Sequence, residues 1–155
     1  MNYDGLEVEV SQLIDQASEE RLRAFGADTV TRLVRNDTQW GLVDRAALDP
    51  GAWMALEDAC RHIRTASGAE LRGHLRRIDE GVLTDGDMDF PLLNILDAID
   101  QWTTFLETGT RDALRELALR AIDQVDFQFE ADLSDVLATP EMAAELDRIK
   151  RLLNG

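Results

Sequence analysis

Two histidines each follow a carboxylate by four residues, and this spacing could build a small polar site. Asp58 precedes His62, and Glu70 precedes His74. Residues four apart lie on one face of a helix, so a carboxylate could orient the imidazole or share a metal ion with it. Helical di-iron sites instead use Glu-x-x-His twice, with two further carboxylates. Because neither pair has that offset, ordinary surface pairs are the leading interpretation. A metal site would require the two helices to pack face to face.

A short acidic segment, DGDMD at 85–89, offers carboxylate oxygens at alternating positions, as a calcium-binding loop does. An EF-hand loop also requires Gly at its sixth position and a bidentate Glu at its twelfth. Counted from Asp85, these positions hold Phe90 and Leu96. We therefore expect an acidic, solvated loop that caps the next helix. Calcium binding by Asp85, Asp87 and Asp89 is the alternative.

A repeated D-x-x-D spacing, in Asp97 with Asp100 and in Asp123 with Asp126, could place two carboxylate pairs between helices. A catalytic dyad needs burial or a like-charged neighbour to separate its pKa values. On a helical wheel Asp97 and Asp123 lie far from the apolar stripe, and Asp100 and Asp126 lie near its rim. Contact with a partner is therefore a better expectation for these four carboxylates than catalysis.

Motifs of nucleophilic or cofactor-dependent catalysis do not occur in the sequence, which lacks a G-x-S-x-G elbow and a phosphate-binding Gly loop. The single cysteine, Cys60, rules out an internal disulfide and a Cys-based zinc site. It shares a helical face with Trp53, Leu56 and Ile63, which predicts a buried structural thiol. We therefore predict no catalytic residue and no cofactor, and the pattern favours a protein that is not an enzyme.

The segment 90–130, which must position the D-x-x-D carboxylates, has the pattern of two helices with a tight break. Gly109 suits the left-handed residue that ends a helix, and Thr110 suits the cap of the next one. A break this short predicts a central antiparallel hairpin, over about 91–130, whose two apolar stripes share one core. Phe127 points away from the shared stripe, and packing under a third helix is favoured over exposure as an interaction residue. The stripes consist of Leu92, Ile95, Leu96, Ile99, Trp102 and Leu106, and of Leu114, Ala118, Ala121, Ile122, Val125 and Phe129.

The rest of the chain predicts further helices that pack against this hairpin. Asp49-Pro50 and Thr139-Pro140 combine a capping side chain with Pro at the first helical position, and Ser67 with Glu70 fits a capping box. Strict apolar–polar alternation is too short for a sheet. We predict an all-α bundle of about six to eight helices that forms a single domain over residues 1–155. The expected helices are 6–17, 18–35, a short one around 40–47, 50–66, 67–78 and 140–153, with a loop at 79–89 and either a turn or continued helix at 131–138.

Composition restricts the class of partner. The 155 residues carry a formal charge of −15. Nucleic acids are unsuitable partners for such a chain, since phosphate binding requires a basic surface. A basic partner protein is compatible with this charge, which also simply keeps a protein soluble. The chain shows no signal-peptide pattern and no apolar run long enough for a membrane span, so we expect a cytoplasmic protein without a membrane partner.

The order of these helices resembles domain-of-unknown-function family 416, a family of uncharacterised bacterial helical proteins. The similar segments are an early helix, SEERLRAFGADTVTRLV at 18–34, a middle segment, DPGAWMALEDA at 49–59, and the late pair LLNILDAIDQW at 92–102 and ALRAIDQVDFQFE at 118–130. The residues at 35–37 stand where the family has a Pro-Tyr pair. The resemblance implies an all-α fold and no catalytic residue.

Three hypotheses about function follow. The first is a small acidic binding protein, conceivably an immunity-type inhibitor of a basic toxin, because an acidic surface accelerates encounter with a basic partner. The second is a helical enzyme or metal protein that uses the Asp, Glu and His side chains above. The third is a homo-oligomeric structural protein with Trp40 or Phe127 in its interface.

Overall fold

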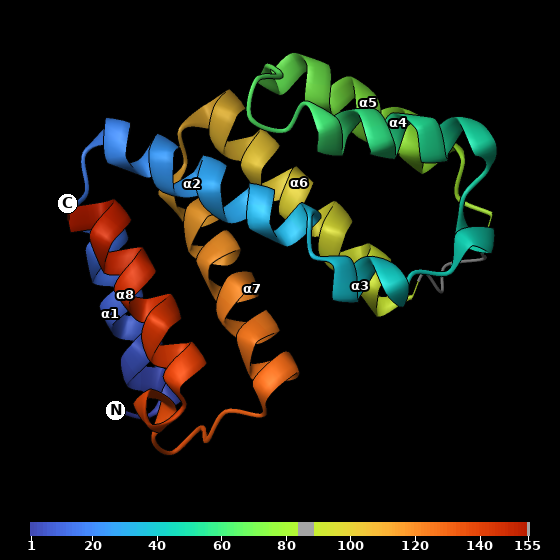
Figure 1. Cartoon of the computed structure of the whole chain (residues 1–155). Helices are drawn as coiled ribbons and strands as arrows, with labels where there is room; N and C mark the ends of the chain where they lie inside the picture. Colours follow the sequence, from blue (N-terminus) through green and yellow to red (C-terminus); the bar gives the residue numbers. More distant parts are fainter. Residues whose placement is uncertain (84–88, 155) are drawn as a thin grey trace. The chain divides into compact units, whose positions relative to one another are not determined.

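The computed structural model describes residues 1–83 and 89–154, and in these ranges the chain is helical (Figure 1). The described part contains no strand beyond an isolated bridge between Leu48 and Val82, so the predicted all-α class is confirmed. The α-helices are Tyr3–Gln16 (α1), Glu19–Val34 (α2), Asp37–Gly41 (α3), Pro50–Arg61 (α4), Gly68–Glu80 (α5), Phe90–Thr108 (α6), Arg111–Phe129 (α7) and Pro140–Asn154 (α8). Two short 3₁₀ helices are Arg45–Ala47 (η1) and Val136–Ala138 (η2).

The chain divides into two compact units. Unit 1 comprises Met1–Thr29 and Thr110–Gly155, and unit 2 comprises Val30–Gly109. One boundary falls inside α2 and the other between α6 and α7. The expectation of a single domain over residues 1–155 stays a prediction. Among the described residues, no helix combines the length and apolar character that a membrane span requires.

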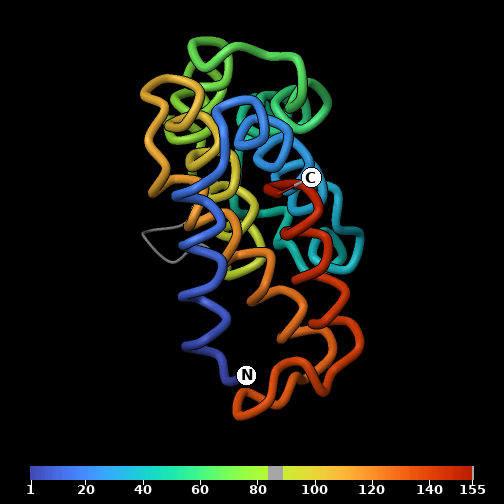
Figure 2. Tube along the Cα trace, turned by 90° about the vertical axis from the view of Figure 1, so that its left-hand side faces the viewer, coloured from blue at the N-terminus to red at the C-terminus, as the bar shows by residue number. Residues whose placement is uncertain are grey.

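Unit 1 is built from α1, α7 and α8, each of which packs against the other two. Helices α1 and α8 run in the same direction and α7 runs in the opposite one (Figures 1 and 2). The amphipathic stripes of these three helices and the first part of α2 supply the buried residues of this unit, since burial of apolar surface is the main stabilising term in folding. Fully or nearly fully buried are Leu6, Val10, Ile14, Phe25, Leu114, Leu117, Ala118, Ile122, Met142, Leu146 and Ile149.

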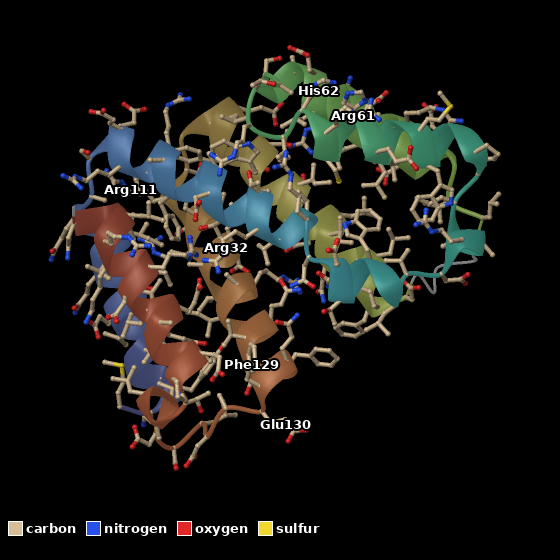
Figure 3. All side chains as sticks on the ribbon, viewed as in Figure 1. Arg32, Arg61, His62, Arg111, Phe129 and Glu130 are labelled. Carbon is tan, nitrogen blue, oxygen red and sulfur yellow. The ribbon has the colours of Figure 1, made fainter. Side chains whose placement is uncertain are left out.

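Arg111, at the first position of α7, caps the C-terminal end of α1. Its guanidinium donates to the carbonyl oxygens of Ile14 and Ala17, the latter at 3.0 Å. The last carbonyls of a helix lack partners within the helix, and a cation at this end also meets the negative pole of the helix dipole. Arg111 therefore ties the start of α7 to the end of α1 (Figure 3).

Unit 2 is built around α5, which packs against α4 on one side and against α6 on the other. Ser67 caps α5 in the predicted capping box, with the Ser67 Oγ accepting from the Glu70 amide at 3.1 Å. Asp49 caps α4 by accepting from the Ala52 amide at 2.7 Å and from Arg77 at 3.1 Å. The Ala52 bond and the charge of Arg77 lower the pKa of Asp49. The predicted caps at Ser67 and Asp49 thus form as expected.

The two helices of the predicted hairpin are confirmed, and their shared core stays a prediction. Gly109 is the left-handed residue between α6 and α7, with φ of 71°, as expected. The Thr110 side chain, however, makes no capping hydrogen bond. Helix α6 packs against α5 and α3, whereas α7 packs against α1 and α8. Each stripe therefore contributes to the packing of its own unit.

Two helix ends and the short helix expected around 40–47 differ from expectation. In place of that helix, α3 begins earlier, at Asp37, and ends at Gly41, and η1 follows at Arg45–Ala47. Helix α4 ends at Arg61 rather than at about residue 66. The buried Ile63 turns its carbonyl to the indole N–H of Trp102 at 3.1 Å, so a tertiary contact replaces the next helical hydrogen bond. Helix α5 continues to Glu80, two residues into the expected loop. The ambiguous segment 131–138 forms a turn followed by η2.

Candidate functional site

The carboxylates of the two His-containing pairs bind groups other than the histidines. Asp58 accepts from Arg61 at 3.2 Å, and Glu70 accepts from the backbone of Ser67 at 3.4 Å. His62 lies beyond the last turn of α4, beside Arg61 and exposed to solvent (Figure 3).

His74 is half-buried on α5. Within residues 1–83 and 89–154, no group of three or more His, Cys, Asp or Glu side chains could hold a metal ion. The metal hypothesis for Asp58, His62, Glu70 and His74 therefore has no cluster in this part of the chain to support it.

The acidic segment at 85–89 is described only at its last residue, since Asp85 and Asp87 lie outside the described residues. Asp89 is the N-cap of α6, where its carboxylate accepts from the Leu92 amide at 3.1 Å. Its second oxygen accepts from the Asp44 amide at 2.6 Å. The expectation that this segment caps the next helix is thus confirmed at Asp89, whose two oxygens are both engaged in structural hydrogen bonds.

The first D-x-x-D pair is part of the α5–α6 packing in unit 2. Arg72 of α5 binds Asp100 at 2.7 Å and Glu107 at 2.7 Å, and it also donates to the Thr104 hydroxyl. These hydrogen bonds to Glu107 and Asp100 raise the pKa of Arg72. Asp97 is half-buried on the same helix. Asp100 is therefore engaged in holding α6 against α5.

The second D-x-x-D pair begins an exposed acidic surface at the end of α7 in unit 1. Asp123, Asp126, Phe127 and Glu130 recur at intervals of three and four residues, so they lie on one side of the helix. We call these four residues the acidic face. Phe127 lies in the middle of the acidic face, and its side chain is 73 % exposed. The favoured expectation that it packs under a third helix is therefore wrong.

The surroundings of the acidic face extend its negative charge. Between residues 121 and 135 the chain has five acidic residues and no Lys, Arg or His. Phe129 of the predicted stripe is 48 % exposed and lies with Glu130 at the end of α7 (Figure 3). Asp132 follows in the next turn, and its hydrogen bonds with the Ser134 hydroxyl and amide lower its pKa. The Asp132 carboxylate is therefore charged at neutral pH.

Asp123 has a structural partner as well. The Tyr3 hydroxyl donates to the Asp123 carboxylate at 2.5 Å and joins the start of α1 to α7. Burial, followed by this hydrogen bond, raises the pKa of Tyr3 above its ordinary value. Of the four predicted partner-binding carboxylates, Asp100 and Asp123 thus support the fold, and Asp126 lies half-exposed on the acidic face.

A cleft in unit 2 has no counterpart among the sequence predictions. It is open, encloses about 560 Å³, and takes its walls from the end of α2, from α3 and η1, and from one side of α4. Cys60, expected to be buried, is half-buried in its lining, and burial raises the pKa of this thiol to about 12. The cleft is lined by Val34, Arg35, Asp37, Trp40, Arg45, Trp53, Glu57, Cys60 and Arg61.

The chain was compared with family models, with curated proteins and with solved structures, and no match was found in any of the three comparisons.

Proposed function

We propose that this protein is a small acidic binding protein whose acidic face contacts a basic protein partner. The single observation that carries the proposal is the composition of the end of α7 and the turn after it. Five carboxylates occur there without a basic residue, and an aromatic ring, Phe127, stands exposed among them. An aromatic anchor surrounded by like charges is typical of a surface that binds cationic side chains.

The unit that contains the acidic face carries the larger share of the negative charge. Unit 1 carries 17 acidic and 8 basic residues, a formal charge of −9, and unit 2 carries 14 and 8, a formal charge of −6. Opposite charges on two proteins accelerate their encounter, and salt weakens this effect because it screens exposed charges beyond about 10 Å at 0.1 M. We therefore expect binding that becomes slower as the salt concentration rises.

A narrower version of the proposal makes the partner a basic toxin that this protein inhibits, as an immunity protein does. The acidic character of the chain and the absence of a catalytic motif in its sequence support this version. The resemblance to domain-of-unknown-function family 416 remains a proposal alongside it. Stoichiometric inhibition of the captured basic protein would distinguish an immunity protein from a binding protein of another kind.

The experiment captures partners from a lysate of the source cells on the immobilised protein, with elution by salt and identification by mass spectrometry. Three proteins are compared: the natural chain, a variant of the acidic face with Asp126→Asn, Phe127→Ala and Glu130→Gln, and a control with Asp79→Asn and Glu80→Gln. The control also removes two negative charges, but from exposed positions at the end of α5. Carboxylates there oppose the helix dipole, so their removal does not weaken the helix.

The proposal predicts that a basic protein is captured by the natural chain and by the control, and is lost with the acidic-face variant. Recovery of the same protein by the acidic-face variant would show that binding occurs elsewhere. If the specifically bound proteins are not basic, the partner class is wrong. Thermal unfolding of all three proteins checks that each is folded.

A further inference from the structure

We propose that the cleft of unit 2 binds a small molecule that combines a planar aromatic ring with a carboxylate or phosphate group. Its volume of about 560 Å³ lies within the range of small-molecule sites, about 300–1,000 Å³. The cleft is formed by residues of unit 2, whereas the acidic face belongs to unit 1, and its proposed ligand is anionic where the partner of the acidic face is basic.

Two tryptophans provide the aromatic wall of the cleft. The ring centroids of Trp40 and Trp53 are 6.5 Å apart and their planes are tilted by 49°. Each indole N–H donates to a backbone carbonyl: Trp40 to Val34 at 2.6 Å, and Trp53 to Arg45 at 2.9 Å. These bonds fix the orientation of both rings before a ligand arrives, and a preorganised wall lowers the entropic cost of stacking.

Three arginines and two carboxylates line the cleft. The lining therefore has a formal charge of +1, opposite in sign to the charge of the whole chain. Arg35, Arg45 and Arg61 line it together with the carboxylates of Asp37 and Glu57, in a chain with a formal charge of −15.

The arginines of the cleft differ in how far they are already engaged. Arg61 shares its charge with Asp58 at 3.2 Å. Within the described residues, the guanidinium groups of Arg35 and Arg45 make no hydrogen bond or ion pair. No group in the described part of the chain competes for their donors, and guanidinium groups bind a carboxylate or phosphate in a bidentate manner.

The position of Arg45 favours an anionic ligand over a cationic one. Its guanidinium carbon lies 5.0 Å from the centroid of the Trp53 ring, within the distance of a cation–π interaction. The protein's own cation thus occupies the place that a quaternary ammonium group would take. An anionic ligand would instead contact this guanidinium, with its ring against the two indoles.

The chemistry of Cys60 indicates binding rather than covalent catalysis in the cleft. A cysteine reacts as a thiolate, and burial keeps this thiol protonated at neutral pH. Glu57 opposes deprotonation further, whereas Arg35 favours it. Cys60 therefore forms an uncharged part of the wall.

The test uses four probes with the whole protein: 2-naphthoate and adenosine 5′-monophosphate, and their uncharged counterparts 2-naphthamide and adenosine. Binding is followed by NMR through the three indole N–H signals. Trp102 serves as an internal reference, because it is 3 % exposed and donates to the Ile63 carbonyl, outside the lining of the cleft.

The matched variants are Arg35→Gln, Arg45→Gln and, as the control, Arg76→Gln. Each removes one positive charge from an exposed side chain of unit 2, and Arg76 lies on α5 outside the lining. We expect at least one anionic probe to shift the Trp40 and Trp53 signals while that of Trp102 stays in place. Arg35→Gln and Arg45→Gln should each raise its Kd about tenfold, and Arg76→Gln less than about twofold, since a charge-assisted hydrogen bond contributes on this scale.

The uncharged counterpart of the binding probe should bind about tenfold more weakly than the probe itself. Tighter binding of naphthoate identifies the recognised group as a carboxylate, and tighter binding of the nucleotide identifies it as a phosphate. The proposal is wrong if charged and uncharged probes bind equally, if Arg76→Gln weakens binding as much as the cleft variants, or if no probe shifts either cleft indole at about 10 mM, where even weak sites are occupied.

Discussion

The Arg148 guanidinium and the Glu145 carboxylate lie 2.6 Å apart on adjacent turns of α8, and their side chains are only 7 % and 6 % exposed. Arg148 also binds Asp28 at 2.7 Å and Thr29 at 3.2 Å, both on α2. Its guanidinium lies 5.7 Å from the centroid of the Phe25 ring. A buried charge is tolerated when its hydrogen-bonding groups are satisfied, and this network satisfies Arg148 from two helices.

Arg148→Met should therefore destabilise the protein by about 3–5 kcal/mol, because it removes the guanidinium that forms an ion pair with the buried Glu145 carboxylate. The double variant Arg148→Met with Glu145→Leu should recover most of this loss, since an apolar pair of similar size carries no desolvation cost. Urea unfolding followed by far-ultraviolet circular dichroism measures both values. A double variant that is no more stable than Arg148→Met would show that the pair is not coupled in this way.

Gly81 is required by space and not by backbone conformation. A Cβ atom placed there would lie 2.4 Å from the Ala52 Cβ and 2.6 Å from the Asp49 Oδ1, close to the cap of α4. Gly81→Ala should lower the free energy of unfolding by about 1–3 kcal/mol, which is the usual cost of inserting an extra methyl group into a well-packed site. Gly73, in the interior of α5, meets nothing within 4 Å, so Gly73→Ala should stabilise by up to about 1 kcal/mol through helix propensity. Equal effects of the two substitutions in thermal unfolding would contradict this explanation.

Tyr3 should make stability decrease at alkaline pH. Burial and the hydrogen bond to Asp123 raise its pKa in the folded protein above the ordinary value of about 10. The protonated phenol therefore contributes stability that is fully present below the unfolded pKa, and that is lost as the pH rises, because the unfolded chain then releases the proton first. The stability difference between the natural chain and Tyr3→Phe should be largest near neutral pH and should shrink above about pH 10.

The test of this pH dependence benefits from composition, since Tyr3 is the single Tyr of the chain. Its ionisation can be followed directly by ultraviolet absorbance in the folded and the urea-unfolded protein. Cys60, whose pKa is also raised, acts in the same direction and is present in both the natural chain and Tyr3→Phe. Identical titration midpoints in the folded and unfolded states would refute the assignment.

Local features of the fold could be predicted from the sequence because their causes are local. The capping box of Ser67, the Asp49 cap before Pro50 and the left-handed Gly109 each depend on a few consecutive residues. The apolar stripes likewise identified most buried positions, since helical periodicity decides which face is apolar.

The pairing of the helices could not be predicted in the same way. The stripe that contains Ile99 is complementary to any apolar helix face, so helical periodicity alone does not identify α5 and α3 as its packing partners. The cleft was missed for a related reason. Arg35, Trp40, Arg45 and Trp53 come from four separate segments with no common period, so no sequence pattern brings them together.

Cys60 should react unusually slowly with alkylating reagents. With its pKa raised to about 12, the thiolate fraction at about pH 8 should be at least a hundredfold smaller than in the unfolded chain, and the rate should fall accordingly. Two exposed charges of the cleft provide matched tests of opposite sign. Arg35→Gln should slow the reaction further, because Arg35 favours the thiolate, and Glu57→Gln should accelerate it.

Because Cys60 is the only cysteine, the rate of iodoacetamide modification measured by mass spectrometry reports this site alone. The rate in the folded natural chain should rise steadily with pH well beyond the point at which the unfolded chain has reached its maximum. Changes of the same sign in Arg35→Gln and Glu57→Gln would show that altered access, rather than electrostatics, controls the thiol.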